Sequence, residues 1–291
     1  MISISQLVWR FGAIICFCAG LGFTQIASAQ CSVAADTAAA IDKLQRARDN
    51  FTVSGTFLRE SAVRRDFVEV IKSDIESTGT VQFVNSKAAN AEQTFHLPLG
   101  RYMDPCEVLK LYAVSLARGP KVAGNITQVL QFRPRDALRL GHVLALEKDS
   151  GVLLRSDTIS EDGELLERHE FATVTISPVT TGGASEQSQA DSPLYLNIPG
   201  LPRGYTVSLA RGYEGRALFV SDGVAAATVI FEPLPNNVKP GEGAVRRGAT
   251  LTYTRGSFVA GKKILVTVIG EIPLAAARVI ADAVKLTAGQ R

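Results

Sequence analysis

Four acidic residues fall within seven positions, and closely spaced carboxylates are the groups that glycosidases use for acid–base catalysis. These residues are Glu161, Asp162, Glu164 and Glu167. Glu161-Asp162-Gly163 separates two alternating apolar segments, which is typical of a tight hairpin turn. Acidic side chains on such a turn need no explanation beyond solubility, so we assign them no catalytic role.

The other residues that could do chemistry are isolated. His96, His142 and His169 have no second histidine and no cysteine within a few positions, which excludes a local metal-ligand cluster. The sequence has no Gly-x-Ser-x-Gly and no His-Glu-x-x-His, and no dinucleotide fingerprint follows Gly241-Glu242-Gly243. We therefore expect neither an enzyme nor a bound cofactor or metal.

Basic residues are concentrated in the last third of the chain. Residues 194–291 contain twelve Lys and Arg against six Asp and Glu, a net +6, whereas residues 30–177 carry −2. The whole chain is only +3, which is too balanced for a dedicated nucleic-acid binder. The segregation suits an acidic peptide or a phosphate-bearing lipid, although a solvated basic face without a partner is the alternative. The candidate contacts are Arg246, Arg247, Lys262, Lys263 and Arg255, the two adjacent pairs being expected in exposed turns.

Apolar residues on the expected strands of the first half could line a lipid cavity. The candidates are Phe57, Phe83, Phe95, Phe132 and Leu144. An ordinary core is the favoured alternative, because alternating strands bury one face in any fold. A true cavity would take up an apolar dye or co-purify with lipid.

The N-terminus predicts export. Arg10 precedes an apolar run over residues 11–23, and Ala27-Ser28-Ala29 follows it. This order is typical of a secretory signal peptide, and the run is too short for a comfortable membrane span. We expect cleavage after Ala29, with an uncleaved anchor as the alternative. We reject a lipoprotein at Cys31, because Gln30 is a poor residue before a lipidated cysteine.

Two cysteines follow the expected cleavage site, Cys31 and Cys106. An even pair in an oxidising compartment is a disulfide candidate. Such a bridge would close a loop of about 75 residues and contribute roughly 4 kcal/mol in the chain-entropy model. Two unpaired thiols are the alternative, because spacing alone cannot bring two Cα atoms together.

The elements that must position these residues fall into two parts. Residues 178–193 (PVTTGGASEQSQADSP) are too polar and too rich in Gly, Ser and Pro to order themselves, which predicts a linker. We expect a signal peptide at 1–29, a first domain at 30–177 and a second domain at 194–291. Helical spacing predicts helices near 36–49, 105–117 and 274–285, and alternation predicts strands between them. The pattern favours an α+β fold of antiparallel sheets with helices on one face.

Three stretches of the sequence, in their order along the chain, match the pattern of a known family. The first, PRDALRLGHVLALEKDSGVLLRSDTISEDGELLERHEF at 134–171, contains an Arg-x-Gly strand at Arg139 and a Gly-x-x-Leu-Glu end. The second is Ser221-Asp222-Gly223 and the strand after it, and the third is VTVIGEIP at 266–273 before a helix. Together with GLPRGY at 200–205, they resemble the MucB/RseB family of periplasmic stress regulators. Residues 60–125 lack the longer middle stretch of that family.

The resemblance implies a fold and a function. It implies an N-terminal lipoprotein-carrier-like (LolA-like) antiparallel sheet wrapped over helices around an apolar cavity, and a smaller C-terminal α+β domain. That second domain would bind the periplasmic region of an anti-sigma factor, shield it from proteolysis and so restrain the envelope-stress sigma factor, sigma-E. Lipid or lipopolysaccharide would release it.

Two other classes stay open, a periplasmic lipid or lipoprotein carrier and, more remotely, a structural envelope protein. A second domain with its own basic face favours the regulator, because a carrier needs only the first domain. The oligomeric state stays open, a homo-oligomer included.

Overall fold

The computed structural model describes residues 34–62, 64–73, 78–83, 93–96, 104–179, 195–196, 198–209, 217–259 and 262–288. Residues Val33–Arg291 form one compact unit. The expected signal peptide and most of the expected linker lie outside the described residues.

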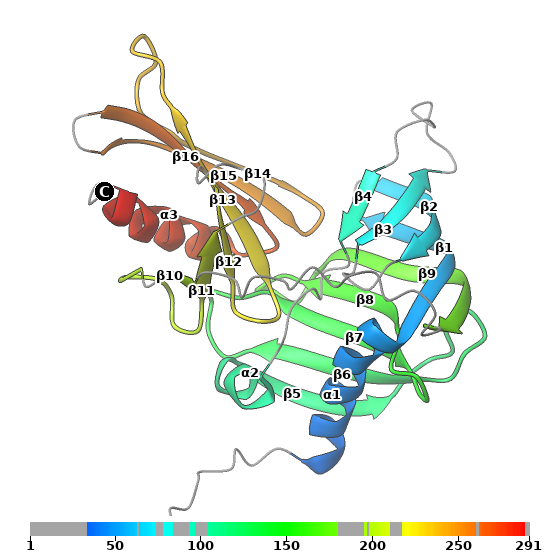
Figure 1. Cartoon of the computed structure of the whole chain (residues 1–291). Helices are drawn as coiled ribbons and strands as arrows, with labels where there is room; N and C mark the ends of the chain where they lie inside the picture. The colour runs from blue at the N-terminus through cyan, green and yellow to red at the C-terminus, as the bar shows by residue number, and fades with distance from the viewer. Residues whose placement is uncertain are drawn as a thin grey trace, which may run out of the picture. The chain divides into compact units, whose positions relative to one another are not determined.

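A nine-stranded antiparallel sheet forms the first part of the described chain (Figure 1). Its spatial order is β4-β3-β2-β1-β9-β8-β7-β6-β5. The strands are β1 (Phe51–Ser61), β2 (Arg64–Ser73), β3 (Thr78–Phe83), β4 (Gln93–His96), β5 (Tyr112–Arg118), β6 (Thr127–Pro134), β7 (Gly141–Glu147), β8 (Leu153–Ile159) and β9 (Leu165–Pro178). Hairpins join most neighbours, and β9 returns to pair with the whole length of β1, from Phe51↔Pro178 to Ser61↔Glu167.

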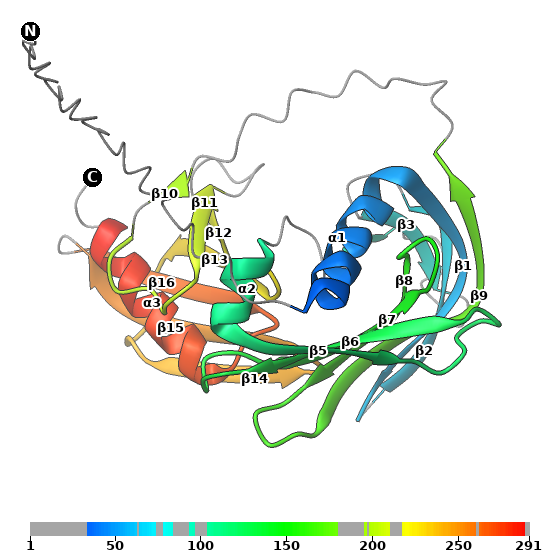
Figure 2. The same cartoon turned by 90° about the horizontal axis from the view of Figure 1, so that it is seen from below.

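Helix α1 (Ala35–Asn50) lies on the concave face of this sheet (Figure 2). Its apolar residues recur every three or four positions, so Ile41, Leu44 and Ala47 point to one side and are buried. Ile41 and Leu44 pack with Leu130, Phe132 and Leu144 in one cluster of core residues.

Helix α2 (Pro105–Leu111) is shorter than its sequence predicts. It begins at Asp104, whose carboxylate accepts the backbone N–H groups of Cys106 (2.8 Å) and Glu107 (3.4 Å). The expected helix over 105–117 is wrong beyond Leu111, because the chain continues as β5 and pairs with β6. Tyr112 and Leu116 fit a helical and an alternating pattern equally well, and the pairing with β6 decides between them.

A seven-stranded antiparallel sheet forms the second part of the described chain, in the order β10-β11-β12-β13-β16-β15-β14. The strands are β10 (Tyr195–Leu196), β11 (Thr206–Leu209), β12 (Ala217–Ser221), β13 (Ala226–Pro233), β14 (Glu242–Arg247), β15 (Thr250–Val259) and β16 (Lys262–Gly270). Helix α3 (Leu274–Ala288) lies along one face of it (Figure 2). Its expected inner stripe is confirmed, because Ala277, Ile280, Ala281 and Val284 are all buried. Two antiparallel sheets with few helices confirm the α+β class.

Candidate functional site

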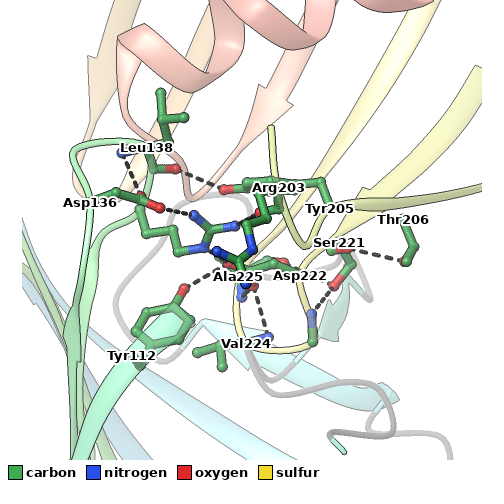
Figure 3. Close-up of polar contacts among 12 residues, drawn as sticks. Tyr112, Asp136, Leu138, Arg203, Tyr205, Thr206, Ser221, Asp222, Val224 and Ala225 are labelled. Atoms are coloured by element: carbon green, nitrogen blue, oxygen red, sulfur yellow. Dashed lines mark hydrogen bonds and ion pairs between the residues drawn. The ribbon is translucent and has the colours of Figure 1, made fainter. Parts of the chain in front are cut away.

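A buried ion pair joins the segment between β6 and β7 to the turn between β12 and β13 (Figure 3). The Arg139 guanidinium donates through Nε to Oδ2 of Asp222 at 2.8 Å. Both side chains have no solvent exposure. Removing two charges from water costs several kcal/mol per ion, so this arrangement persists only if every donor and acceptor finds a partner.

Asp222 uses both carboxylate oxygens. Oδ1 accepts the backbone N–H groups of Val224 (3.0 Å) and Ala225 (2.8 Å), which closes the β12–β13 turn. Oδ2 accepts the Tyr112 hydroxyl at 2.8 Å as well as Arg139. The carboxylate therefore holds its own turn in shape and ties it to β5.

Arg139 is equally well satisfied. Its Nη1 donates to Oδ2 of Asp136 at 2.5 Å, and its Nη2 donates to the Arg203 carbonyl. The guanidinium carbon lies 5.0 Å from the centroid of the Tyr205 ring, in cation–π contact. The Tyr205 hydroxyl in turn donates to the Leu138 carbonyl at 2.9 Å.

The electrostatics keep the Arg139 guanidinium charged. Burial lowers the pKa of the Arg139 guanidinium, but Asp222, Tyr205 and Asp136 together outweigh it, so the pKa is raised. Burial, and then the Asp222 charge, raise the pKa of Tyr112 well above its usual value, which keeps this hydroxyl a donor. The network holds ionised and neutral groups in fixed roles, which suits positioning rather than proton transfer.

The pair of Arg139 and Asp222 was not among the candidate residues predicted from the sequence. Arg139 belongs to the Arg-x-Gly motif just before β7 and Asp222 to Ser-Asp-Gly, two of the motifs that carried the resemblance. Arg203 and Tyr205 come from the Gly-Leu-Pro-Arg-Gly-Tyr stretch. Three motifs that separately looked like turns and strands thus meet in one network. The available signal was a charged residue in each of the Arg-x-Gly and Ser-Asp-Gly motifs.

Glu167 forms a second buried link between the sheets. Its carboxylate on β9 pairs with the Arg59 guanidinium and accepts the Ala249 backbone N–H at 2.8 Å from the β14–β15 turn. Burial opposes ionisation, but hydrogen bonds from His169, Arg59 and that N–H lower the pKa of Glu167 to about 2. Glu167 is thus a buried anchor for the β14–β15 turn, and its interpretation as a soluble turn residue is wrong, because it lies on β9 and is 2% exposed.

The structure gives Arg246 a role inside the molecule. It lies at the end of β14, and its Nη1 and Nη2 donate to the carbonyls of Ala249 (2.7 Å) and Ile272 (2.8 Å). These bonds connect the turn that Glu167 holds to the segment before α3. Arg247, the next residue, is exposed.

We predict that Arg246→Met lowers the free energy of unfolding by about 2 kcal/mol, because two charge-assisted hydrogen bonds are lost while the aliphatic stem is kept. Arg247→Met is the matched control and should change stability by less than about 0.5 kcal/mol. Urea denaturation followed by far-ultraviolet circular dichroism gives both values. Equal stability of the two variants would contradict this role for Arg246.

The other basic candidates do not form one patch. Lys262 and Lys263 begin β16, at the opposite end of β15 from Arg246 and Arg247. A ten-residue strand such as β15 spans about 30 Å, which separates the two pairs. Lys263 donates to the Asn236 carbonyl (2.9 Å), and Arg255 pairs with Asp282 of α3 (3.0 Å). Arg247 and Lys262 are the exposed candidates.

The candidates for a lipid cavity that lie within the described residues are part of a packed core. Phe57 is buried on β1 in edge-to-face contact with Phe171, and Phe132 and Leu144 are buried against α1. The side chains of Phe83 on β3 and Phe95 on β4 lie outside the described residues. Cys106 is disulfide-bonded, and its expected partner Cys31 lies outside the described residues, so the pairing stays a prediction.

His142 on β7 is a buried polar residue without a hydrogen-bond partner for Nε2 among the described residues. Its residue exposure is 2%. It borders a pocket of about 740 Å³ that Arg133, Arg135 and the β8–β9 turn also line. The described part of the chain contains no group of three metal-ligating side chains and no helix long and apolar enough to cross a membrane.

Comparison with known proteins identifies related sequences. The MucB/RseB N-terminal domain model matches residues 54–193, and the C-terminal domain model matches residues 204–285. The sigma factor AlgU regulatory protein MucB of Pseudomonas aeruginosa is 28% identical over 242 residues, which cover 75% of this chain and 73% of MucB. The sigma-E factor regulatory protein RseB of Haemophilus influenzae is 26% identical over 186 residues, covering 57% of this chain and 56% of RseB.

Solved structures of MucB share the fold. The P. aeruginosa MucA/MucB complex matches with a TM-score of 0.63 and 25% identity over 85% of this chain and 97% of that chain. MucB in complex with MucA(peri) matches with a TM-score of 0.60 and 26% identity, over 84% and 97%. A LolA superfamily protein from Nitrosomonas europaea reaches a TM-score of only 0.22, which is too low to support the LolA-like assignment.

Proposed function

Because this chain belongs to the MucB/RseB family, we propose that it regulates a sigma factor by binding the periplasmic region of an anti-sigma factor. The observation that carries the proposal is the match to MucB solved with MucA(peri). That match covers both sheets, since it spans 84% of this chain. The named relatives are regulatory proteins, in keeping with the prediction of a regulator rather than an enzyme.

We also propose a cellular location and a domain organisation for this protein. The protein works in the periplasm after cleavage behind Ala29, with domains at 30–177 and 194–291 joined by residues 178–193. A Cys31–Cys106 disulfide holds the N-terminus of the mature chain in place. The LolA-like fold of the first domain and the release of the partner by lipid or lipopolysaccharide are carried by the sequence resemblance to the family at 134–171, 200–205, 221–223 and 266–273.

The mechanism we propose is competitive shielding. While the anti-sigma factor is bound, its periplasmic region is hidden from proteases, and the sigma factor stays restrained. Binding stabilises the shielded state by RT ln(1 + [L]/Kd), about 2.7 kcal/mol when the regulator exceeds Kd a hundredfold. A ligand releases the partner only if it has different affinities for the bound and free states.

The test is crosslinking in the cells that make the protein. Tagged full-length protein is crosslinked gently and purified, and its partners are identified by mass spectrometry, with lipid extraction from the same sample. We expect a single-pass anti-sigma factor as the dominant protein, and limited proteolysis of its periplasmic region should slow when this protein is added. Lipid or lipoprotein cargo without an anti-sigma factor would overturn the proposal and favour a carrier.

A further inference from the structure

The seven-stranded sheet has one face that α3 covers and one that it leaves open. Val229, Val268 and Tyr253 point toward α3 and are almost completely buried. Successive side chains of a strand alternate between faces, so Thr228, Ile269 and Thr252 point the other way. Those open-face residues are only half-buried, and no described helix covers them over β13, β16, β15 and β14.

The open-face residues form a continuous row across the strands. Phe219 on β12 pairs with Thr228, Thr228 pairs with Ile269, and Ile269 pairs with Thr252. Thr252 pairs with Val245 on β14, the edge strand. Four steps between strands at about 4.8 Å make the row about 19 Å long.

The two ends of this row differ. At the β12 end, Phe219 borders a pocket of about 320 Å³ that Val108 and Leu111 of α2 also line. At the β14 end, Val245 is 58% exposed. Phe258 is also 58% exposed and on the same face, but it lies six residues from Thr252, about 20 Å along β15. Val245 extends the half-buried row of Ile269 and Thr252 to the edge of the sheet, and an apolar row without a covering helix is a candidate interaction surface.

The charge at the β14 end indicates the kind of partner. Arg247 lies two residues after Val245, hence on the same face, and is exposed. The acidic residue of β14, Glu242, lies on the other face, where it binds Tyr253 (2.8 Å) and Arg278 of α3 (2.9 Å). The row therefore offers apolar and threonine side chains that end at a guanidinium, within a part of the chain that carries +6. The exposed Glu232 is on the same face but lies four residues beyond Thr228 on β13, outside the row.

We infer that this row is the docking surface for one amphipathic segment of the anti-sigma factor's periplasmic region. This inference rests on the proposed function and adds the surface and the chemistry of the segment. The segment places apolar side chains over Ile269 and Val245 and an acidic residue at Arg247. A row of about 19 Å matches about six residues of extended chain or about thirteen of helix.

The test compares two identical substitutions on opposite sides of the sheet. Val245→Glu puts a negative charge on the row, next to where the acidic residue would bind. Val279→Glu puts the same charge on α3, where Val279 is 38% exposed, and is the control. The probe is the fluorescein-labelled periplasmic region of the anti-sigma factor recovered by the crosslinking above, and fluorescence anisotropy measures its Kd with full-length protein.

We expect Val245→Glu to raise Kd at least tenfold and Val279→Glu to leave it within twofold. Thermal unfolding of both variants should match that of the wild type, because both positions are exposed. Equal Kd values for the two variants and the wild type would overturn the docking surface while leaving the proposed function intact. A wild type that does not bind the probe would instead overturn the proposed function. A photocrosslinker at position 245 should join the anti-sigma factor; a crosslink to a second copy of this chain would overturn the inference.

Discussion

Replacing Asp222 with asparagine is expected to lower the free energy of unfolding by about 3–5 kcal/mol, the cost typical of leaving a buried charge without its partner. Asparagine keeps one oxygen for the backbone N–H groups of Val224 and Ala225. Its amide then faces the Arg139 guanidinium and the Tyr112 hydroxyl, which are both donors toward Oδ2 in the native network. Among the described residues, Arg139 would retain Asp136 as its ionic partner, and that residue is partly exposed.

A double-mutant cycle separates the ion pair from the rest of the network. Arg139→Met alone should also cost several kcal/mol, because it leaves the Asp222 carboxylate buried and unpaired. The variant with both changes should lose less than the sum of the two, because it removes both charges. Urea denaturation of the four proteins gives the coupling free energy.

Asp162→Asn serves as the control for the same chemical change at an exposed position of the β8–β9 turn. It should stay within about 0.5 kcal/mol of the wild type. If Asp222→Asn is no more destabilising than Asp162→Asn, then the buried pair does not hold the two sheets together.

Local periodicity predicted much of the fold, because it reports on burial along one element. The stripe of Ala277, Ile280 and Val284 defines α3, and alternation defines most strands. Periodicity failed where two periods coincide, as from Val108 to Leu116, and there the chain turns from α2 into β5. Periodicity also missed β14. Its sequence, EGAVRR, contains one β-branched residue, Val245, and its residues are mostly exposed.

The candidate site was less predictable, because its residues meet only after folding. Arg139 and Asp222 are 83 positions apart, and each sits in a short connection between strands. The expected role of Arg246 rested on exposure in a turn, but its guanidinium is held by two carbonyls. Burial of a charged side chain is set by the neighbouring elements, and no local pattern encodes it.

Acid is expected to destabilise the protein through His142. Burial alone lowers the pKa of His142 to about 4, from an ordinary value of 6.5, because no described group stabilises the charged imidazole. The unfolded chain therefore binds a proton below about pH 6.5 that the folded chain resists until about pH 4. Stability from this group is complete above pH 6.5 and is lost as the pH falls toward 4, by about 3 kcal/mol in all.

His142→Phe and His142→Gln should both flatten this dependence, because neither side chain titrates. Their stabilities at pH 7 can differ from each other, since Phe places an apolar ring beside its strand neighbour Phe132 and Gln introduces a buried amide. The free energy of unfolding of the wild type and of each variant is measured every half pH unit from pH 4 to 7.5. Subtracting one from the other removes the contributions of all titratable groups that the two proteins share. A difference that does not change with pH would show that His142 is not the source. A change of about 3 kcal/mol would instead mean that acid loosens the first sheet at β7, beside the segment that carries Arg139 and its link to the second sheet.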